Sequence, residues 1–122
     1  MAVETQVFSE QSVHFGNYAT FFWTWPGDNS KVPASKRLNI TSLTLSYFPT
    51  GGGTVGNADI AGRISGNAVW RLQSVFVEPY RTVHLTFPGG LTLEAGGQVQ
   101  VGFVTQGPGA MFVSANGKLV DV

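Results

Sequence analysis

Apolar and polar residues alternate one by one over the stretch from Thr82 to Val104. Its apolar positions are Val83, Leu85, Phe87, Leu91, Leu93, Val99, Val101 and Phe103. A period of two residues sends successive side chains to opposite faces of a β-strand. The Pro88-Gly89-Gly90 and Ala95-Gly96-Gly97 segments interrupt the alternation, and such segments are typical of turns. The pattern therefore predicts half-buried antiparallel strands that are joined by tight turns.

The longest predicted strand runs from Leu38 to Phe48, and its apolar phase changes once. Leu38 and Ile40 share one face of a regular strand, whereas Leu43, Leu45 and Tyr47 share the other. One extra residue near Thr41-Ser42, a β-bulge, would turn all five apolar side chains to the same side. We therefore expect a bulge there, with all five residues in the core.

The same pattern of strand-forming segments separated by turn residues continues over the rest of the chain. Further strands are expected at Val3–Phe8, Ser12–Phe15, Tyr18–Trp25, Ala58–Ile64, Val69–Val77 and Ala110–Val122. Asn116-Gly117, inside the last of these, predicts either a hairpin turn or a bulge. Since no segment has the 3.6-residue period of an amphipathic helix, the fold class is all-β. We expect residues 1–122 to form a single antiparallel β-sandwich or jelly roll of about eight strands.

Composition favours contacts between copies of this chain over contacts with nucleic acid. Charged residues make up 11% of the sequence, and they cancel to a net charge of zero. Nucleic-acid binders carry a clustered basic surface, and here only Lys31, Lys36 and Arg37 lie close together. A surface without net charge repels its own copies weakly. A homo-oligomer is therefore expected, and no nucleic-acid partner.

No membrane span and no signal peptide are expected. The longest apolar runs fall short of the ~20 residues that a membrane-crossing helix needs. The first residues contain neither a basic segment nor an apolar one, both of which a signal peptide has. The sequence contains no cysteine, so disulfides and thiolate metal sites are excluded. We expect the protein in a virion or in an extracellular setting.

Cofactor and metal motifs are weak. Gly51–Gly56 matches the dinucleotide pattern G-x-G-x-x-G, but strand-like residues follow it where that motif needs a helix. We interpret it as a loop between strands. The chain's acidic residues and its two histidines, His14 and His84, show no metal-ligand spacing. We therefore expect neither a metal nor a cofactor.

His84 carries the one enzymatic alternative. It is flanked by Thr82 and Thr86, so it should lie on the exposed face of its strand. Paired with Glu78 or Glu94 it could serve a small hydrolase, because convergent sites need no sequence motif. We favour the interpretation that His84 is a surface histidine without a catalytic role, and we assign no catalytic residue.

Aromatic residues gather between Phe21 and Trp25. Phe21, Trp23 and Trp25 share one face of a regular strand, which favours a place in the core. The alternative is a sugar-binding corner, since Pro26 ends the strand beside the two tryptophans. The candidate ligand-binding residues are Trp23, Trp25, Asp28 and Asn29. Phe22 and His84, both expected on outward faces, are the candidate interface residues.

One sequence pattern near the C-terminus resembles that of a known family. It reads Leu91-x-Leu93-x-x-Gly96-x-x-Val99-x-Val101, and a last strand from Phe112 to Val120 follows it. This resembles the final strands of small jelly-roll domains of the complement-C1q and tumour-necrosis type. The resemblance covers only the C-terminal part of the chain, and the N-terminal half lacks the aromatic pattern of that family. It implies a compact homotrimer that serves binding or assembly.

Two hypotheses of different class follow. The first is a non-enzymatic homo-oligomer, with a trimer favoured, that acts as a structural or accessory protein such as a capsid-decoration or tail-associated component. Its partners would be copies of itself and a capsid or tail protein. The second is a carbohydrate-binding module or lectin that binds a glycan through the Trp23 and Trp25 corner.

Overall fold

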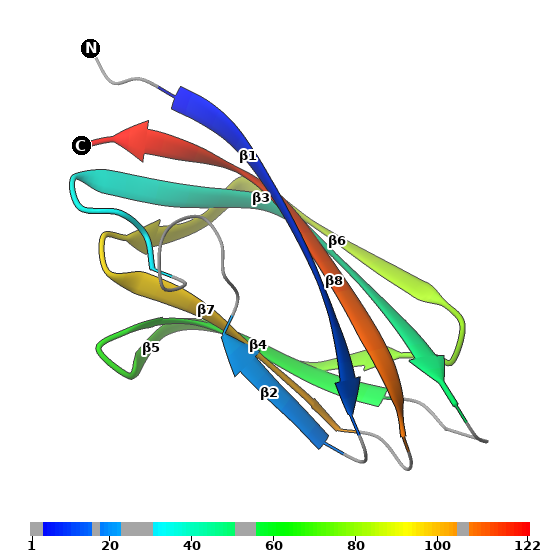
Figure 1. Ribbon diagram of the computed structural model, residues 1–122. Coiled ribbons are helices and arrows are strands. Elements are labelled where there is room, and N and C mark those ends of the chain that lie inside the picture. The colour runs from blue at the N-terminus through cyan, green and yellow to red at the C-terminus, as the bar shows by residue number, and fades with distance from the viewer. Residues whose placement is uncertain (1–3, 16–17, 23–30, 51–55, 105–107) are drawn as a thin grey trace.

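The computed structural model describes residues 4–15, 18–22, 31–50, 56–104 and 108–122 (Figure 1). These residues form eight strands. They are β1 (Glu4–Phe15), β2 (Tyr18–Phe22), β3 (Lys36–Pro49), β4 (Gly56–Ile64), β5 (Asn67–Val77), β6 (Thr82–Glu94), β7 (Gly97–Val104) and β8 (Gly109–Asp121). Within the described part of the chain there is no helix with the length and apolar content to cross a membrane.

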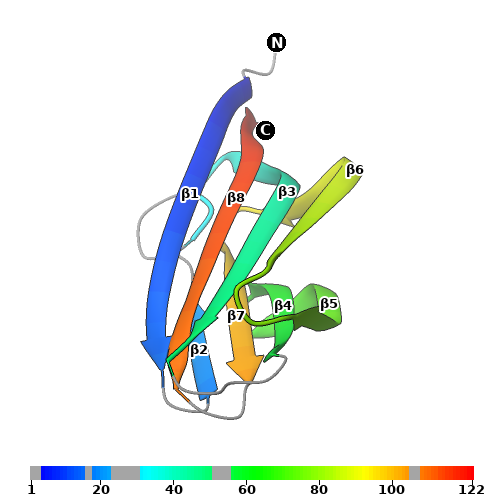
Figure 2. The same ribbon diagram turned by 90° about the vertical axis from the view of Figure 1, so that its right-hand side faces the viewer.

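The strands form two four-stranded antiparallel sheets that face each other (Figure 2). One sheet has the order β1-β8-β3-β6, and we call it the first sheet. The second sheet has the order β2-β7-β4-β5. The expectation of an all-β chain with antiparallel sheets is therefore confirmed. Most connections cross between the sheets, but β4 and β5 form a hairpin through Ser65-Gly66, whose φ angles of 51° and 83° suit a two-residue turn.

The core lies between the two sheets. It is built from the inward-facing residues, which alternate along each strand with residues that face outward. In β7, Val99, Val101 and Phe103 are fully buried, whereas Gln100 and Gly102 between them are not. Phe103 meets Tyr47 of β3 edge to face, with ring centroids 5.2 Å apart. Gly56 leaves room for the Phe103 ring, since a Cβ there would lie 2.0 Å from its Cζ atom. The alternation of apolar and polar residues in the sequence therefore matches the alternation of buried and less buried residues in the strand.

The bulge expected in β3 is present. The register of β3 against both of its neighbours shifts between Ile40 and Ser42. Leu38 and Ile40 before the shift are completely buried, and so are Leu43, Leu45 and Tyr47 after it. The extra residue, Thr41, turns outward, and its Oγ1 donates a hydrogen bond to the Asn116 carbonyl oxygen at 3.1 Å.

The turn expected at Pro88-Gly89-Gly90 is wrong, because β6 continues through it. Ile40 pairs with Leu91 and Ser42 pairs with Thr86, so residues 87–90 of β6 lie opposite Thr41 of β3. Gly89 and Gly90 have φ angles of 85° and 79°, which glycine adopts without strain. The glycines therefore belong to a four-residue bulge of β6, residues 87–90, opposite the one in β3, and the chain does not reverse.

Three other details of the strands and turns differ from the prediction. The two short segments before Phe15 form one strand, β1, because β8 pairs with its entire length. Asn116-Gly117 forms no turn, since β8 is paired there with β1 on one side and β3 on the other. The predicted turn at residues 95–97 does exist, but β6 and β7, which it joins, belong to different sheets.

We expect Gly90→Ala to destabilise the fold more than Gly89→Ala. Both substitutions place alanine at a positive φ, which costs about 1–2 kcal/mol. At Gly90 the new Cβ would also lie 1.7 Å from Asn39 Oδ1, whereas at Gly89 it would meet nothing within 4 Å. Overpacking of this kind costs roughly 1–3 kcal/mol more. Urea unfolding of the two variants measures the difference, and equal losses of unfolding free energy would contradict the close contact with Asn39.

Candidate functional site

The predicted sugar-binding corner lies outside the described residues. Trp23, Trp25, Asp28 and Asn29 all fall between residues 23 and 30, which the structure does not describe. Phe22 is the last residue of β2, and its backbone is paired with Gln100 of β7. Its place at an interface, like the sugar corner, stays a prediction.

His84 lies on the outer face of β6 and is exposed, as its flanking threonines predict. Its Nδ1 atom is 2.7 Å from the Thr44 hydroxyl of β3. Two residues further along both strands, the hydroxyl groups of Ser46 and Thr82 form a second cross-strand hydrogen bond at 2.9 Å. His84 is thus part of a flat surface of paired polar side chains, and its role at an interface stays a prediction.

The structure keeps His84 apart from Glu94, one of the two acids considered for a hydrolase. His84 pairs with Thr44 and Glu94 pairs with Arg37, seven positions apart on β3, so their backbones are roughly 20 Å apart. Hydrogen-bond reach is ~3 Å. Glu94 accepts instead a hydrogen bond from Arg37 Nε at 2.9 Å. Within the described residues, His84 bonds to no carboxylate.

The two histidines do not meet either. His14 is on β1 and His84 on β6, and these strands form opposite edges of the first sheet. Three strand spacings separate their backbones by at least roughly 14 Å. No group of three or more histidine or acidic residues that could hold a metal ion occurs in the described part of the chain.

Four large exposed apolar side chains mark one end of the sandwich, where the odd-numbered strands finish (Figure 1). They are Phe48, Phe76, Tyr80 and Val104, and we call this surface the apolar end. Phe48 and Phe76 are the last residues but one of β3 and β5, Val104 is the last residue of β7, and Tyr80 lies between β5 and β6. Both described termini, Glu4 and Val122, lie at the opposite end (Figure 1).

Tyr80 is the centre of the apolar end. Its side chain is 69% exposed, yet it is fixed at three points. Its backbone N–H donates to the Tyr47 carbonyl oxygen at 2.8 Å, and its hydroxyl donates to the Pro49 carbonyl oxygen at 2.7 Å. Its ring packs against Phe48, with centroids 6.3 Å apart. A φ angle of 58° is uncommon for a bulky residue, so the surrounding contacts hold this exposed ring in a strained backbone.

Phe76 and Val104 extend the apolar end onto the outer face of the second sheet. Phe76 of β5 and Val104 of β7 both pair with Asn57 of β4, one on each side. Phe76 is 63% exposed and Val104 is 50% exposed. Within the part of the chain that the structure describes, the buried Oδ1 atom of Asn57 has no hydrogen-bond partner. The exposed side chains of Phe76 and Val104 therefore present apolar surface on either side of Asn57.

Opposite charges flank Tyr80. Glu78 and Arg81 are both exposed, and their only mutual hydrogen bond joins the Arg81 backbone N–H to the Glu78 carbonyl oxygen, at 3.1 Å. Neither side chain forms an ion pair with a described residue. An apolar surface that carries one charge of each sign can match a second copy of itself.

Sequence reasoning did not identify these residues, although a signal exists. Phe48 follows the inward Tyr47, and Val104 follows the inward Phe103. Two adjacent apolar residues cannot both face the core of a regular strand, so one of them must point outward. Apolar pairs at strand ends therefore mark exposed apolar positions.

Comparison with known proteins yields no family. No family model matches the chain, and no curated protein matches it. Among solved structures, it is similar to chains titled "Structure of infectious bursal disease virus Gx strain" (TM-score 0.41, 16% identity) and "Crystal structure of infectious bursal disease virus VP2 subviral particle" (TM-score 0.41, 12% identity). Both likenesses cover 98% of this chain, which spans only 31% and 36% of theirs. A third, "Bacillus endospore appendages form a novel family of disulfide-linked pili", has a TM-score of 0.31 at 14% identity and covers 93% of this chain and 89% of that chain. Likenesses of this size say nothing about function.

We expect Tyr80→Phe to lower the unfolding free energy by about 1 kcal/mol, because it removes the hydrogen bond to the Pro49 carbonyl oxygen. Thr86→Val is the matched control, since the Thr86 hydroxyl makes no hydrogen bond within the described residues. Its effect should stay within about 0.5 kcal/mol. Urea unfolding checks both variants. Equal effects would show that the Tyr80 hydroxyl does not hold the ring.

Proposed function

We propose that this protein is a non-enzymatic structural or assembly protein that associates with copies of itself through the apolar end. The observation that carries the proposal is Tyr80, a largely exposed aromatic residue that is fixed in a strained conformation. Tyrosine is enriched where interfaces concentrate their binding energy. A side chain that is already fixed loses little conformational entropy when a partner covers it.

The occupant that fits this surface is a second copy of the chain. Glu78 and Arg81 offer one charge of each sign on either side of Tyr80. Charged residues are few and the net charge is zero, so long-range repulsion between copies is weak. A trimer is the favoured state. In that state Tyr80 and Phe76 of neighbouring copies would share one apolar contact.

The biological role that we propose is that of a virion component, such as a capsid-decoration or tail-associated protein. The strand orders β1-β8-β3-β6 and β2-β7-β4-β5 support a jelly roll, the double-sheet design of many capsid domains. A glycan-binding role for the Trp23 and Trp25 corner remains the alternative.

Light scattering coupled to size-exclusion chromatography tests self-association. The unmodified protein should elute at a multiple of its 13.0 kDa chain mass, with roughly three times that mass expected. Tyr80→Ser and Phe76→Ser should shift the population towards the monomer, because each removes exposed apolar surface from the apolar end. Val69→Ser removes an apolar side chain of similar exposure elsewhere and should leave the mass unchanged. A monomer at high protein concentration would refute the proposal.

Exchanging the charges of Glu78 and Arg81 tests whether the partner that binds the apolar end is a second copy of this chain. Glu78→Lys gives the apolar end two positive charges, and like charges brought together destabilise an interface. We expect this variant to dissociate at a protein concentration at least tenfold higher than the unmodified protein. Adding Arg81→Glu restores one charge of each sign and should recover the association. If the double variant dissociates as readily as the single variant, the two charges do not face each other across copies.

A further inference from the structure

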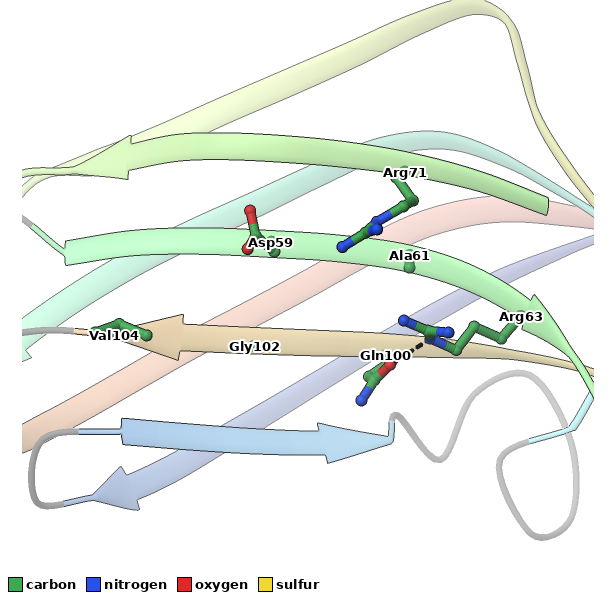
Figure 3. Close-up of a pocket in the computed structure, with 7 residues that line it drawn as sticks. All are labelled: Asp59, Ala61, Arg63, Arg71, Gln100, Gly102 and Val104. Atoms are coloured by element: carbon green, nitrogen blue, oxygen red, sulfur yellow. Dashed lines mark hydrogen bonds between the residues drawn. The ribbon is translucent and has the colours of Figure 1, made fainter. Parts of the chain in front are cut away.

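A shallow trough lies on the outer face of the second sheet, apart from the centre of the apolar end. It has a volume of about 180 Å³. Its lining residues are Asp59, Ala61, Arg63, Arg71, Gln100, Gly102 and Val104, shown in Figure 3. They come from β4, β5 and β7, which are neighbours in this sheet. The side chains that line it are held on paired strands, so the trough belongs to the rigid part of the fold.

Small residues make the trough. Ala61 of β4 pairs with Gln100 of β7, and Asp59 pairs with Gly102. Gly102 has no side chain and Ala61 has a single methyl group, so the sheet surface is low between longer neighbours. Arg71 of β5 pairs with Ala61 from the other side. Two long cationic side chains therefore rise beside a low floor.

The two guanidinium groups lie on either side of Ala61 (Figure 3). Arg63 is fixed, because its Nη1 donates to the Gly66 carbonyl oxygen at 2.9 Å and its Nε donates to Gln100 Oε1. Arg71 is exposed and forms no hydrogen bond or ion pair within the described residues. One arginine is thus preorganised, and the other has all its donors available. Guanidinium groups bind carboxylates in a two-pronged geometry.

Acceptor and amide groups complete the trough. Asp59 Oδ1 accepts the Ser74 backbone N–H at 3.0 Å, which orients the carboxylate and leaves its second oxygen as an acceptor. Gln100 uses its Oε1 on Arg63, which leaves its amide NH₂ as a donor. Two arginines and one aspartate give the trough a net charge of about +1. A small anion without donor groups would face the Asp59 carboxylate unfavourably, whereas hydroxyl groups would satisfy it.

We propose that this trough binds an acidic sugar, a uronic or sialic acid residue with one carboxylate and several hydroxyl groups. The carboxylate bridges Arg63 and Arg71, and the hydroxyl groups contact Asp59 and Gln100. The trough shares Val104 with the apolar end but includes neither Tyr80 nor Phe76, the two residues that we propose to meet between copies. A chain of this kind would attach to acidic glycans with the outer face of its second sheet.

Titration with glucuronate and N-acetylneuraminate, followed by amide chemical shifts in nuclear magnetic resonance, tests the proposal. At least one of the two acids should shift amides of β4, β5 and β7 in a saturable manner, and the pair distinguishes uronic from sialic acids. Glucose, acetate and sulfate are the reference ligands, and each should bind at least tenfold more weakly. Equal binding of acetate or sulfate would overturn the recognition of a sugar, and binding of glucose alone would overturn the role of the arginines.

Single substitutions test whether the trough is the site that binds the acidic sugar. Arg71→Gln should weaken acid binding at least tenfold, and Ala61→Leu should block it by filling the floor of the trough. Arg37→Gln removes an equal charge from the first sheet, where Arg37 pairs with Glu94, and should bind as the unmodified protein does. Amide spectra show whether each variant is folded, and its oligomeric mass should not change. If Arg71→Gln and Ala61→Leu both fold and bind normally, the trough is not the site.

Discussion

The matched bulges of β3 and β6 are the constraint on which the sandwich depends. Without the extra residue at Thr41, either Leu38 and Ile40 or Leu43, Leu45 and Tyr47 would face solvent. Fully burying one such side chain is worth about 1.5–3 kcal/mol, so a strand of the wrong register would lose much of a marginal stability. Gly89 and Gly90 let β6 follow the bulge, and β8 remains continuous along the other side of β3.

The same topology determines where exposed apolar surface collects. Most strands are followed by a strand of the opposite sheet, so β3, β5 and β7 all finish at one end of the molecule. Each of these strands has an exposed apolar residue in its last two positions, at the same end of the molecule as Tyr80. Residues that are scattered along the sequence therefore form one surface. The backbone strain at Tyr80 is borne where the surrounding hydrogen bonds can sustain it.

The two surfaces that we assign differ in chemistry because they lie on different parts of the sheets. The apolar end consists of large side chains at strand termini, and it suits contact with another protein surface. The trough lies across the middle of a paired sheet, where Ala61 and Gly102 create a hollow between charged neighbours. A protein with few charges places two of its arginines beside this hollow, which concentrates its limited electrostatic potential there.

Alternation along the sequence determined the all-β class, the inward faces of β3 and β7, the bulge at Thr41 and the exposure of His84. These are local properties, since they follow from the period of a strand and from the residues on either side. Only the tertiary structure decided that Pro88-Gly90 is a bulge, because this depends on whether β3 continues alongside β6. It also decided which strands are neighbours, and thereby brought Arg63 of β4 and Arg71 of β5 to one trough and Phe48 to Tyr80. Partners that are distant in sequence leave no periodic signal, so pairing between strands had to place them.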